Sequence, residues 1–344
     1  MPDKDVFILG AGFSKAISPL MPTLVELTSL VKDRLADDGL FRLPPPLGAG
    51  LKDDIELWMT YLSQDQPWLA KASNQYNKAL ATHIESLLAA ALNNSIAETV
   101  TVAMPPWLAP LIHAWHQGSA TVITLNYDTL VERAAISGPS PVRLRNIYPE
   151  YFVDISSLSG SLLGNPDLET FSYHKLHGSL NWHYSGRDEF YGEQVHYSGV
   201  TTWGGVDSQH ELRSRNPAAA KAVLIIPPVT EKTAYFTNEY IRTIWTNAGD
   251  ALTEATRVFV IGYSLPRTDI GMGFFLANYV PKESTPWYII NPDKKVLHRF
   301  RDLLPSHDIP DSYVGIENPV PTFVRDYTGE ASEAPQTPLP RCND

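Results

Sequence analysis

A glycine-rich turn near the start of the chain has the residues needed to hold a phosphate group. The turn consists of Gly10, Ala11, Gly12, Phe13 and Ser14. It follows the apolar run Val6–Leu9, which predicts a buried parallel strand, and a helix is predicted after it. Glycines at such a junction let the backbone approach a phosphate, and the first N–H groups of the helix favour negative charge. Ser14 could add a hydroxyl. The pattern therefore predicts a nucleotide site, with a plain tight turn as the alternative.

The same turn departs from the form that dehydrogenases use. That form has a third glycine, and Lys15 stands at its position here. It also has an acidic residue at the end of a second strand about 20 residues further on, where this sequence has the pattern of a helix. Both departures argue against a redox enzyme.

Two further segments could supply catalytic groups. The segment Thr124–Asp128 follows a strand-like run, and the amide of Asn126 in it can hold a water or a ribose hydroxyl. Asp128 could orient a ligand, or it could only cap the next helix. His177 has the side chain of a general base near neutral pH, and Gly178 would allow close approach of a substrate. A buried structural histidine is the alternative, because the chain has ten histidines.

Two later strand ends carry residues that could bind the rest of a nucleotide. Gly262 and Ser264 follow the apolar run 258–261, and Asn291 follows the run 287–290. Gly262 and Ser264 could contact phosphate or ribose, and Asn291 could contact adenosine. Turns after strands favour these residue types in any case, so each motif is weak alone.

The elements that must position these residues alternate along the chain. Strands are predicted at 6–9, 120–125, near 175, and at 223–226, 258–262 and 287–290. Helices are predicted at 129–136, at 238–256, from about Asp269 and after Asp293. This alternation predicts an α/β fold with a Rossmann-like parallel sheet and helices on both faces. Its ligand is expected at the carboxyl ends of the strands, beside a topological switch point.

The domain organisation follows from the stretches between these strands. Residues 21–117 have mostly helical spacing, interrupted at Pro44–Pro46, and residues 179–222 have the composition of loops and short hairpins. We expect one catalytic domain over residues 1–327 with these two insertions. The segment 328–344 is expected to be a disordered tail.

Composition narrows the function classes further. The hydrophobic fraction of 43% predicts a globular protein, and the net charge of −11 argues against direct nucleic-acid binding. Cys342 is the only cysteine, which excludes an intramolecular disulfide and a cysteine-rich zinc site. We expect a cytoplasmic protein, because no signal peptide and no apolar run of about 18 residues is present.

The order of the motifs resembles the sirtuin family (silent information regulator type), and in particular the sirtuin-like domains of bacterial anti-phage defence proteins. The strings Lys175–Trp182 and Leu224–Pro228 are especially similar to that branch. The resemblance implies that NAD+ binds in an extended cleft of a Rossmann-type core. It implies a pyrophosphate loop at Gly10, Ala11, Gly12, Phe13 and Ser14, nicotinamide-ribose contacts at Thr124, Asn126 and Asp128, a catalytic His177, and adenosine contacts at Gly262, Ser264 and Asn291.

Two departures from the deacylating sirtuins concern the side of the cleft that binds a protein substrate. Those enzymes carry a four-cysteine zinc module after the His-Gly motif, and residues 179–222 contain no cysteine. They also have a Phe-Arg pair after the glycine turn, which is missing near Met21-Pro22-Thr23. The NAD+ side of the cleft is therefore expected here without zinc and without a protein-substrate groove.

The expected function is hydrolysis of NAD+ to nicotinamide and ADP-ribose. Asn126 would position a water, His177 would accept its proton, and Asp128 would orient the ribose. NAD+ would be consumed as a substrate, with no recycled cofactor and no metal. By resemblance, the chain would be the NAD+-depleting effector of an anti-phage defence system, activated by homo-oligomerisation or by a partner protein. The alternatives are an NAD-dependent protein deacylase, a non-catalytic NAD or ADP-ribose sensor and, weakest, a redox enzyme.

Overall fold

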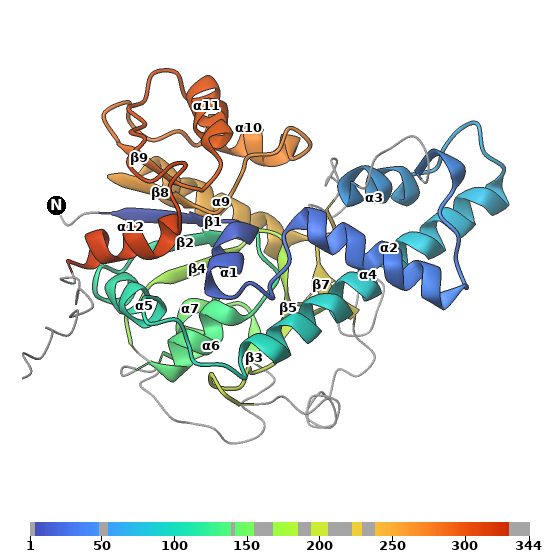
Figure 1. Ribbon diagram of the computed structural model, residues 1–344, viewed down its shortest axis with the longest axis horizontal. Coiled ribbons are helices and arrows are strands. Elements are labelled where there is room, and N and C mark those ends of the chain that lie inside the picture. Colours follow the sequence, from blue (N-terminus) through green and yellow to red (C-terminus); the bar gives the residue numbers. More distant parts are fainter. Residues whose placement is uncertain are drawn as a thin grey trace, which may run out of the picture.

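Five buried segments pair into one all-parallel sheet with the order β4-β2-β1-β8-β9 (Figure 1). Counted along the chain, these strands are the third, second, first, fourth and fifth of the sheet, which is the order of Rossmann-type folds. The predicted Rossmann-like α/β fold is therefore confirmed. The strands are β1 (Asp5–Leu9), β2 (Thr121–Thr124), β4 (Ser172–Lys175), β8 (Arg257–Ile261) and β9 (Trp287–Ile290).

The structure is a computed structural model, and it describes most of the chain. The described residues are 4–47, 54–138, 142–154, 168–184, 194–205, 222–228 and 238–329. The predicted tail falls almost wholly outside them, because residues 330–344 are not described. Thr328, where that tail was expected to begin, is instead the last residue of helix α12 (Pro319–Thr328).

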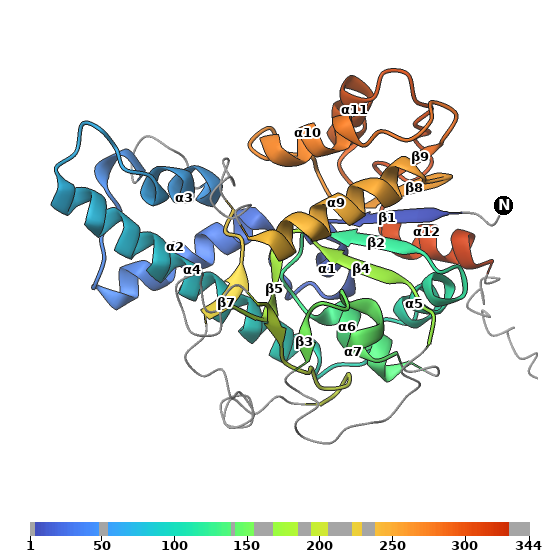
Figure 2. The same ribbon diagram turned by 180° about the vertical axis from the view of Figure 1, so that it is seen from behind.

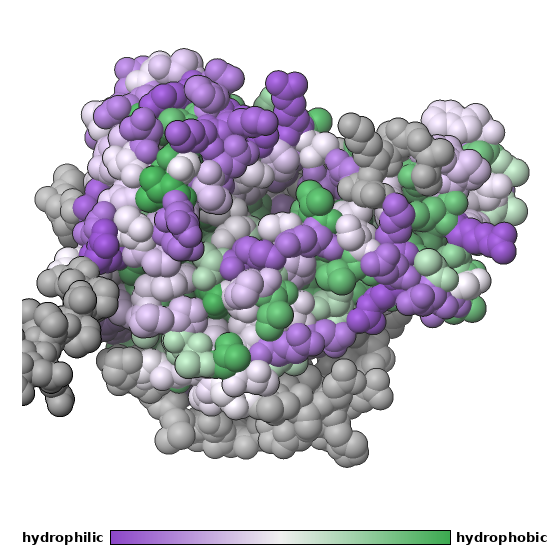
Figure 3. All heavy atoms as spheres, viewed as in Figure 1, coloured by the Kyte–Doolittle hydropathy of each residue, from purple (hydrophilic) through white to green (hydrophobic). Residues whose placement is uncertain are grey.

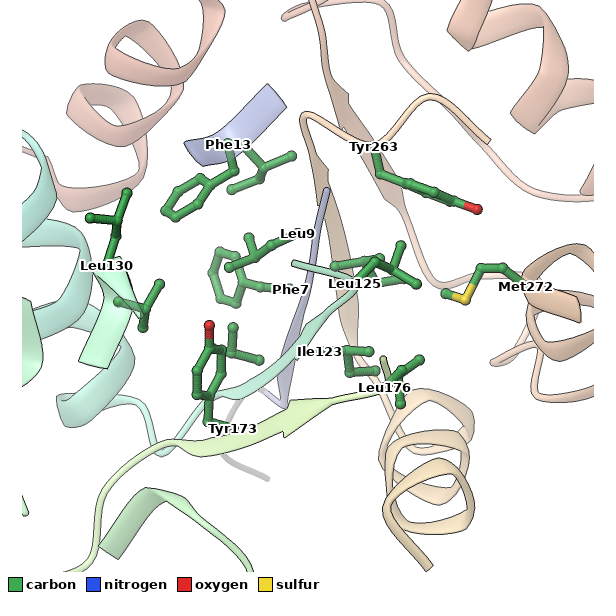
Figure 4. Close-up of a cluster of buried hydrophobic side chains, with 14 of the residues drawn as sticks. Phe7, Leu9, Phe13, Ile123, Leu125, Leu130, Tyr173, Leu176, Tyr263 and Met272 are labelled. Carbon is green, nitrogen blue, oxygen red and sulfur yellow. The ribbon is translucent and has the colours of Figure 1, made fainter. Parts of the chain in front are cut away.

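Helices cover both faces of the parallel sheet, as Figures 1 and 2 show from opposite sides. One face is covered by α1 (Ala11–Ile17), α5 (Leu108–Gln117) and α12, and the other by α9 (Glu239–Thr253). On the first face the ring of Phe7 lies 4.8 Å from that of Phe259 and 5.3 Å from that of Trp115. Figure 4 shows the cluster on both sides of β1. Strands apolar on both faces are thus buried on both faces.

The predicted helical insertion forms a lobe beside the sheet (Figure 1). Thr23 begins α2 with a capping box to Glu26, and Gly39 ends it in the left-handed conformation. The buried residues Leu27, Val31 and Leu35 form one stripe of α2, which packs against α4. The lobe comprises α2 (Leu24–Asp38), α3 (Ile55–Ser63) and α4 (Lys71–Thr99), and α5 follows it. In Figure 3, apolar and polar side chains are interspersed over this face of the molecule.

A second, smaller sheet accounts for part of the predicted loop and hairpin insertion. Its order is β3-β6-β5-β7, and β5 is antiparallel to both of its neighbours. The strand predicted at 223–226 lies in this sheet rather than in the parallel one. Trp182 is fully buried against Phe152, with ring centroids 4.6 Å apart, so it packs the core. The strands are β3 (Val153–Asp154), β5 (Gly178–Tyr184), β6 (His196–Tyr197) and β7 (Ala222–Ile225).

In the described part of the chain, four further helices lie between the strands or follow β9. Asp269 caps α10 by accepting a hydrogen bond from the Met272 N–H. The helix predicted to begin at about Asp269 is therefore present. The four helices are α6 (Leu130–Ser137), α7 (Leu144–Ile147), α10 (Ile270–Asn278) and α11 (Lys294–Leu303). Within the described ranges, none of the helices combines the length and apolar character needed to cross a membrane.

Candidate functional site

The strand register places the predicted site residues at one edge of the parallel sheet. Leu9 pairs with both Thr124 and Ile261, Thr124 pairs with Lys175, and Ile261 pairs with Ile290. Because these strands are parallel, the residues that follow the pairs leave the sheet on the same side. One residue after these paired strand residues come Gly10, Gly262 and Asn291. Two residues after a paired strand residue come Asn126 and His177. The structure thus brings all five motifs to this edge.

Two glycine turns pack backbone against backbone at the switch point between β1 and β8. The Gly12 N–H donates to the Gly262 carbonyl at 2.9 Å, and the Gly10 N–H donates to the Ile261 carbonyl at 3.0 Å. A Cβ on Gly12 would lie 2.8 Å from Gly262 Cα. Gly262 itself has a φ of +66°. Glycine is therefore required at both positions by the contact between the turns, whether or not a phosphate is bound.

The predicted phosphate turn leaves one N–H group for a ligand. Among the described residues, none accepts a hydrogen bond from the Ala11 N–H, the first of helix α1. The Phe13 ring is buried in the core (Figure 4). It lies 5.8 Å from the ring of Trp107. The Phe13 N–H donates to the Gly10 carbonyl at 2.9 Å, so neither its ring nor its N–H is left for the NAD+ contact predicted from the sequence.

Ser14 joins the first two motifs into one hydrogen-bonded unit. Its hydroxyl donates to Asp128 Oδ2 at 2.6 Å and accepts from Asn126 Nδ2 at 2.9 Å. Asn126 Nδ2 also donates to the Gly10 carbonyl at 2.9 Å. Ser14 is only 4% exposed. Its hydroxyl therefore orients Asn126 and Asp128, a role different from the phosphate contact that the sequence suggested.

The amide of Asn126 has a fixed orientation as a result. Both of its Nδ2 hydrogens are used, so its Oδ1 is the acceptor that remains, and no described residue donates to it. Its backbone N–H donates to Thr124 Oγ1 at 3.1 Å, which assigns Thr124 to holding the loop. The N-cap of α6 is Thr129, so Asp128 is not the helix cap proposed as its alternative, although its Oδ1 accepts the N–H of Leu130, the first helical residue, at 3.1 Å.

His177 lies in the turn between β4 and β5, with its ring close to two aromatic rings. The centroids of Tyr127 and Trp245 lie 6.3 and 6.2 Å from that of His177. Tyr127 Oη donates to the Ile226 carbonyl, and the Ile226 N–H donates to the His177 carbonyl. The side chain of His177 is only 7% exposed. Sequence reasoning missed Trp245, because a tryptophan in helix α9 gives no local sign of the distant histidine.

Gly178 has a different role from the one expected of it. Its φ is +80°, and a Cβ there would collide with the Leu224 carbonyl of β7. The glycine is therefore required for pairing β5 with β7, a structural role that the sequence did not reveal.

The two residues Ser264 and Asn291, predicted on the adenosine side, differ in their exposure to solvent. Ser264 is exposed, and its carbonyl accepts from Arg299 Nη1 at 2.7 Å. Asn291 is 7% exposed, and its Oδ1 accepts the Asp293 N–H at 2.9 Å. Asn291 thus holds the turn after β9, while the hydroxyl of Ser264 lies at the surface beside the glycine turns.

A hollow of about 370 Å³ lies at the opposite edge of the sheet. Its lining includes Arg257, the first residue of β8, whose guanidinium binds Asp5 with two hydrogen bonds of 2.7 and 2.6 Å. Tyr327 Oη donates to the same carboxylate. This hollow lies at the amino ends of the strands, so it is separate from the candidate site.

Burial lowers the pKa of a second histidine, His174 of β4, to about 4. His174 therefore stays neutral in the folded protein and gains a proton on unfolding below about pH 6.5. Stability is expected to fall by about 2 kcal/mol through this residue alone as the pH drops from about 7 to 5, and to level off below the folded-state pKa. Urea unfolding at the two pH values should show that His174→Phe loses correspondingly less stability than the wild type when the pH is lowered. The exposed His298→Gln is the matched control, and an unchanged loss in His174→Phe would contradict the prediction.

No protein-family model matches the chain, and no curated protein matches it.

Proposed function

We propose that the chain is an NAD+ glycohydrolase, which cleaves NAD+ to nicotinamide and ADP-ribose. The observation that carries the proposal is the unit formed by Asn126, Ser14 and Asp128. It is hydrogen-bonded to the Gly10 carbonyl under the glycine turn, on the edge of the sheet that also carries His177. In this proposal the dinucleotide and the group that accepts a proton lie at the same edge of the sheet. The resemblance of the motif order to sirtuin-like domains supports the same conclusion.

In this proposal NAD+ lies along the carboxyl edge of the sheet. The pyrophosphate lies at the turn of Gly10 and Gly12, where the Ala11 N–H and the helix dipole favour its charge. The adenosine extends past Gly262 toward Ser264 and Asn291. The nicotinamide ribose lies over Asn126 and Asp128, which places its anomeric carbon on the side of His177.

The reaction breaks the bond between the ribose anomeric carbon and the nicotinamide nitrogen. The bonding electrons leave with nicotinamide, which becomes neutral, so the leaving group requires no acid. Asn126 Oδ1 accepts a hydrogen bond from the attacking water. As the water oxygen bonds to the anomeric carbon, its proton passes to His177, directly or through a ribose hydroxyl. The Asp128 carboxylate stabilises the positive charge that develops on the ribose.

The kinetic signature of Asn126 tests the proposal. Asn126→Ala removes the acceptor that positions the water, so kcat is expected to fall by about 100-fold or more while KM changes little. Ser264→Ala is the matched comparison, because it removes one hydroxyl on the adenosine side. It is expected to raise KM by about threefold to tenfold and to leave kcat unchanged. Equal effects of the two variants on kcat would contradict the roles given to them.

The biological setting is part of the same proposal. NAD+ hydrolysis would deplete the host cell, so we infer that the chain is an anti-phage effector held inactive until it assembles with copies of itself or with a partner protein. Rapid loss of cellular NAD+ after phage infection, absent in His177→Ala cells, is the result expected from this inference. NAD+ that persists equally in both strains would contradict it.

A further inference from the structure

A fully buried ion pair lies directly behind the candidate site. Lys175 Nζ and Glu132 Oε1 are 2.8 Å apart, and both side chains are 0% exposed. Lys175 is the last residue of β4, and Glu132 lies in the first turn of α6. Burying both charges costs hydration, and a buried pair is weak evidence for stability. Glu132 Oε2 accepts no hydrogen bond from the described residues, so the loss of hydration is only partly offset.

The contacts of this pair lead to the loop that carries Asn126. Lys175 Nζ also donates to the carbonyl oxygen of Asp128. Glu132 Oε1 accepts a second hydrogen bond, from Tyr148 Oη at 2.7 Å. Tyr148 Oη lies 3.2 Å from Asn181 Oδ1, to which Ser179 Oγ donates at 2.7 Å. The network therefore begins on the strand before His177 and ends on the strand after it.

Both sides of the His177 turn are held to the same short loop. Before the turn, the Lys175 ammonium binds the Asp128 carbonyl. After the turn, the Leu180 N–H donates to the Tyr127 carbonyl at 3.0 Å. Asn126 immediately precedes these two carbonyl groups in the chain. The relative position of His177 and Asn126 is thus set by contacts that involve neither side chain.

We propose that Lys175 is a positioning residue that fixes His177 against Asn126, with Glu132 supplying its counter-charge. The proposal rests on the function proposed above, because Lys175 contacts no substrate and acts only through the two loops. An ammonium is suited to this role, since it donates at once to a carboxylate and to a carbonyl, and such charge-assisted hydrogen bonds are strong. A neutral side chain of equal size would fill the space and leave the Asp128 carbonyl without its partner.

The test compares two double variants that each remove one ion pair from the parallel sheet. Lys175→Met with Glu132→Gln removes both buried charges together, so that neither is left unpaired. Asp5→Asn with Arg257→Met removes an ion pair at the opposite edge, in which the arginine side chain is 36% exposed, and serves as the control. The first is expected to lower kcat for NAD+ by about 30-fold or more and to leave KM within about threefold. The control is expected to keep kcat within about twofold of wild type.

Amide exchange supplies a readout that does not need catalysis. The Leu180 N–H is expected to exchange at least about tenfold faster in the Lys175/Glu132 variant than in the control. If the wild type leaves NAD+ intact and this acceleration is still found, the proposed function fails and the positioning of the turn stands. If Leu180 exchange is unchanged in the folded variant, or kcat stays within about threefold of an active wild type, the positioning proposal is wrong.

Tyr148→Phe covers the case in which the double variant does not fold. It removes only the hydroxyl that donates to Glu132, and the aromatic packing against Trp182 is retained. A loss of about threefold to tenfold in kcat with unchanged KM is expected, together with faster exchange of the Leu180 N–H. Wild-type values of kcat and of exchange would overturn the proposal on their own.

Discussion

Replacing His177 with alanine is expected to lower the rate of NAD+ cleavage by about 10² to 10⁴, the usual contribution of a general base. The fold should survive, because the turn is held by backbone hydrogen bonds. The Leu176 N–H donates to the Thr124 carbonyl at 2.9 Å, and the Ile226 N–H donates to the His177 carbonyl at 2.8 Å. NAD+ affinity should change by no more than about threefold, since the phosphate turn is untouched. Nicotinamide release measured under single-turnover conditions gives the rate, and calorimetry gives the affinity.

The neighbouring His174 provides the control for this variant. It lies three residues earlier, in β4, and its ring Nδ1 is buried without a hydrogen bond from the described residues. His174→Ala leaves a similar cavity but removes no group from the candidate site. Its cleavage rate should therefore equal that of the wild type at pH 7. A His177→Ala rate equal to that of His174→Ala would remove His177 from the mechanism.

Replacing Gly262 with alanine is expected to have a large structural effect on the site. The new Cβ would lie 2.7 Å from Gly12 Cα and closer still to Phe13 N and Gly12 C, all of them backbone atoms that cannot rotate away. The two turns would have to separate, breaking the 2.9 Å hydrogen bond from the Gly12 N–H. We expect a loss of about 3 kcal/mol or more in stability, together with loss of measurable NAD+ binding.

A Gly39 variant separates the effect of the contact between the two glycine turns from the effect of a positive φ. It ends α2 with a φ of +63°, close to the +66° of Gly262, but a Cβ there would meet nothing within 4 Å. Gly39→Ala should therefore cost only about 1 kcal/mol and leave NAD+ binding intact. Denaturant unfolding and binding calorimetry on both variants measure the difference. Equal losses would show that the packing of the two turns is not what requires Gly262.

The parallel sheet could be predicted because its strands are buried on both faces and therefore appear as continuous apolar runs. Val6–Leu9, 258–261 and 287–290 are such runs, and each one forms a strand. The second sheet could not be predicted in the same way. Its strands β3 and β6 have two residues each, and its pairings join segments that are far apart in the chain. The run at 223–226 has a buried-strand pattern that does not reveal to which sheet it belongs.

The location of the candidate site follows from the sequence, but the contacts within it do not. Strand ends in a parallel sheet meet at one edge, so the residues after them could be brought together by topology alone. The hydrogen bond between Ser14 and Asp128 joins residues 114 positions apart. The pair of Lys175 with Glu132 likewise depends on how α6 packs against β4. Sequence patterns report which side chains are available, whereas partners of this kind are set by packing between distant elements.

Products formed from NAD+ are the most direct measurement of the proposed activity. Wild-type protein is incubated with NAD+ at a dilute and at a high concentration, the latter to favour self-assembly, and the products are followed by proton NMR. Nicotinamide and ADP-ribose should appear in equal amounts with the wild type and at a rate lower by about 10² or more with His177→Ala. NAD+ that stays intact with the wild type at both concentrations, or is cleaved equally fast by His177→Ala, would contradict the assignment of this edge of the sheet as an NAD+-cleaving site.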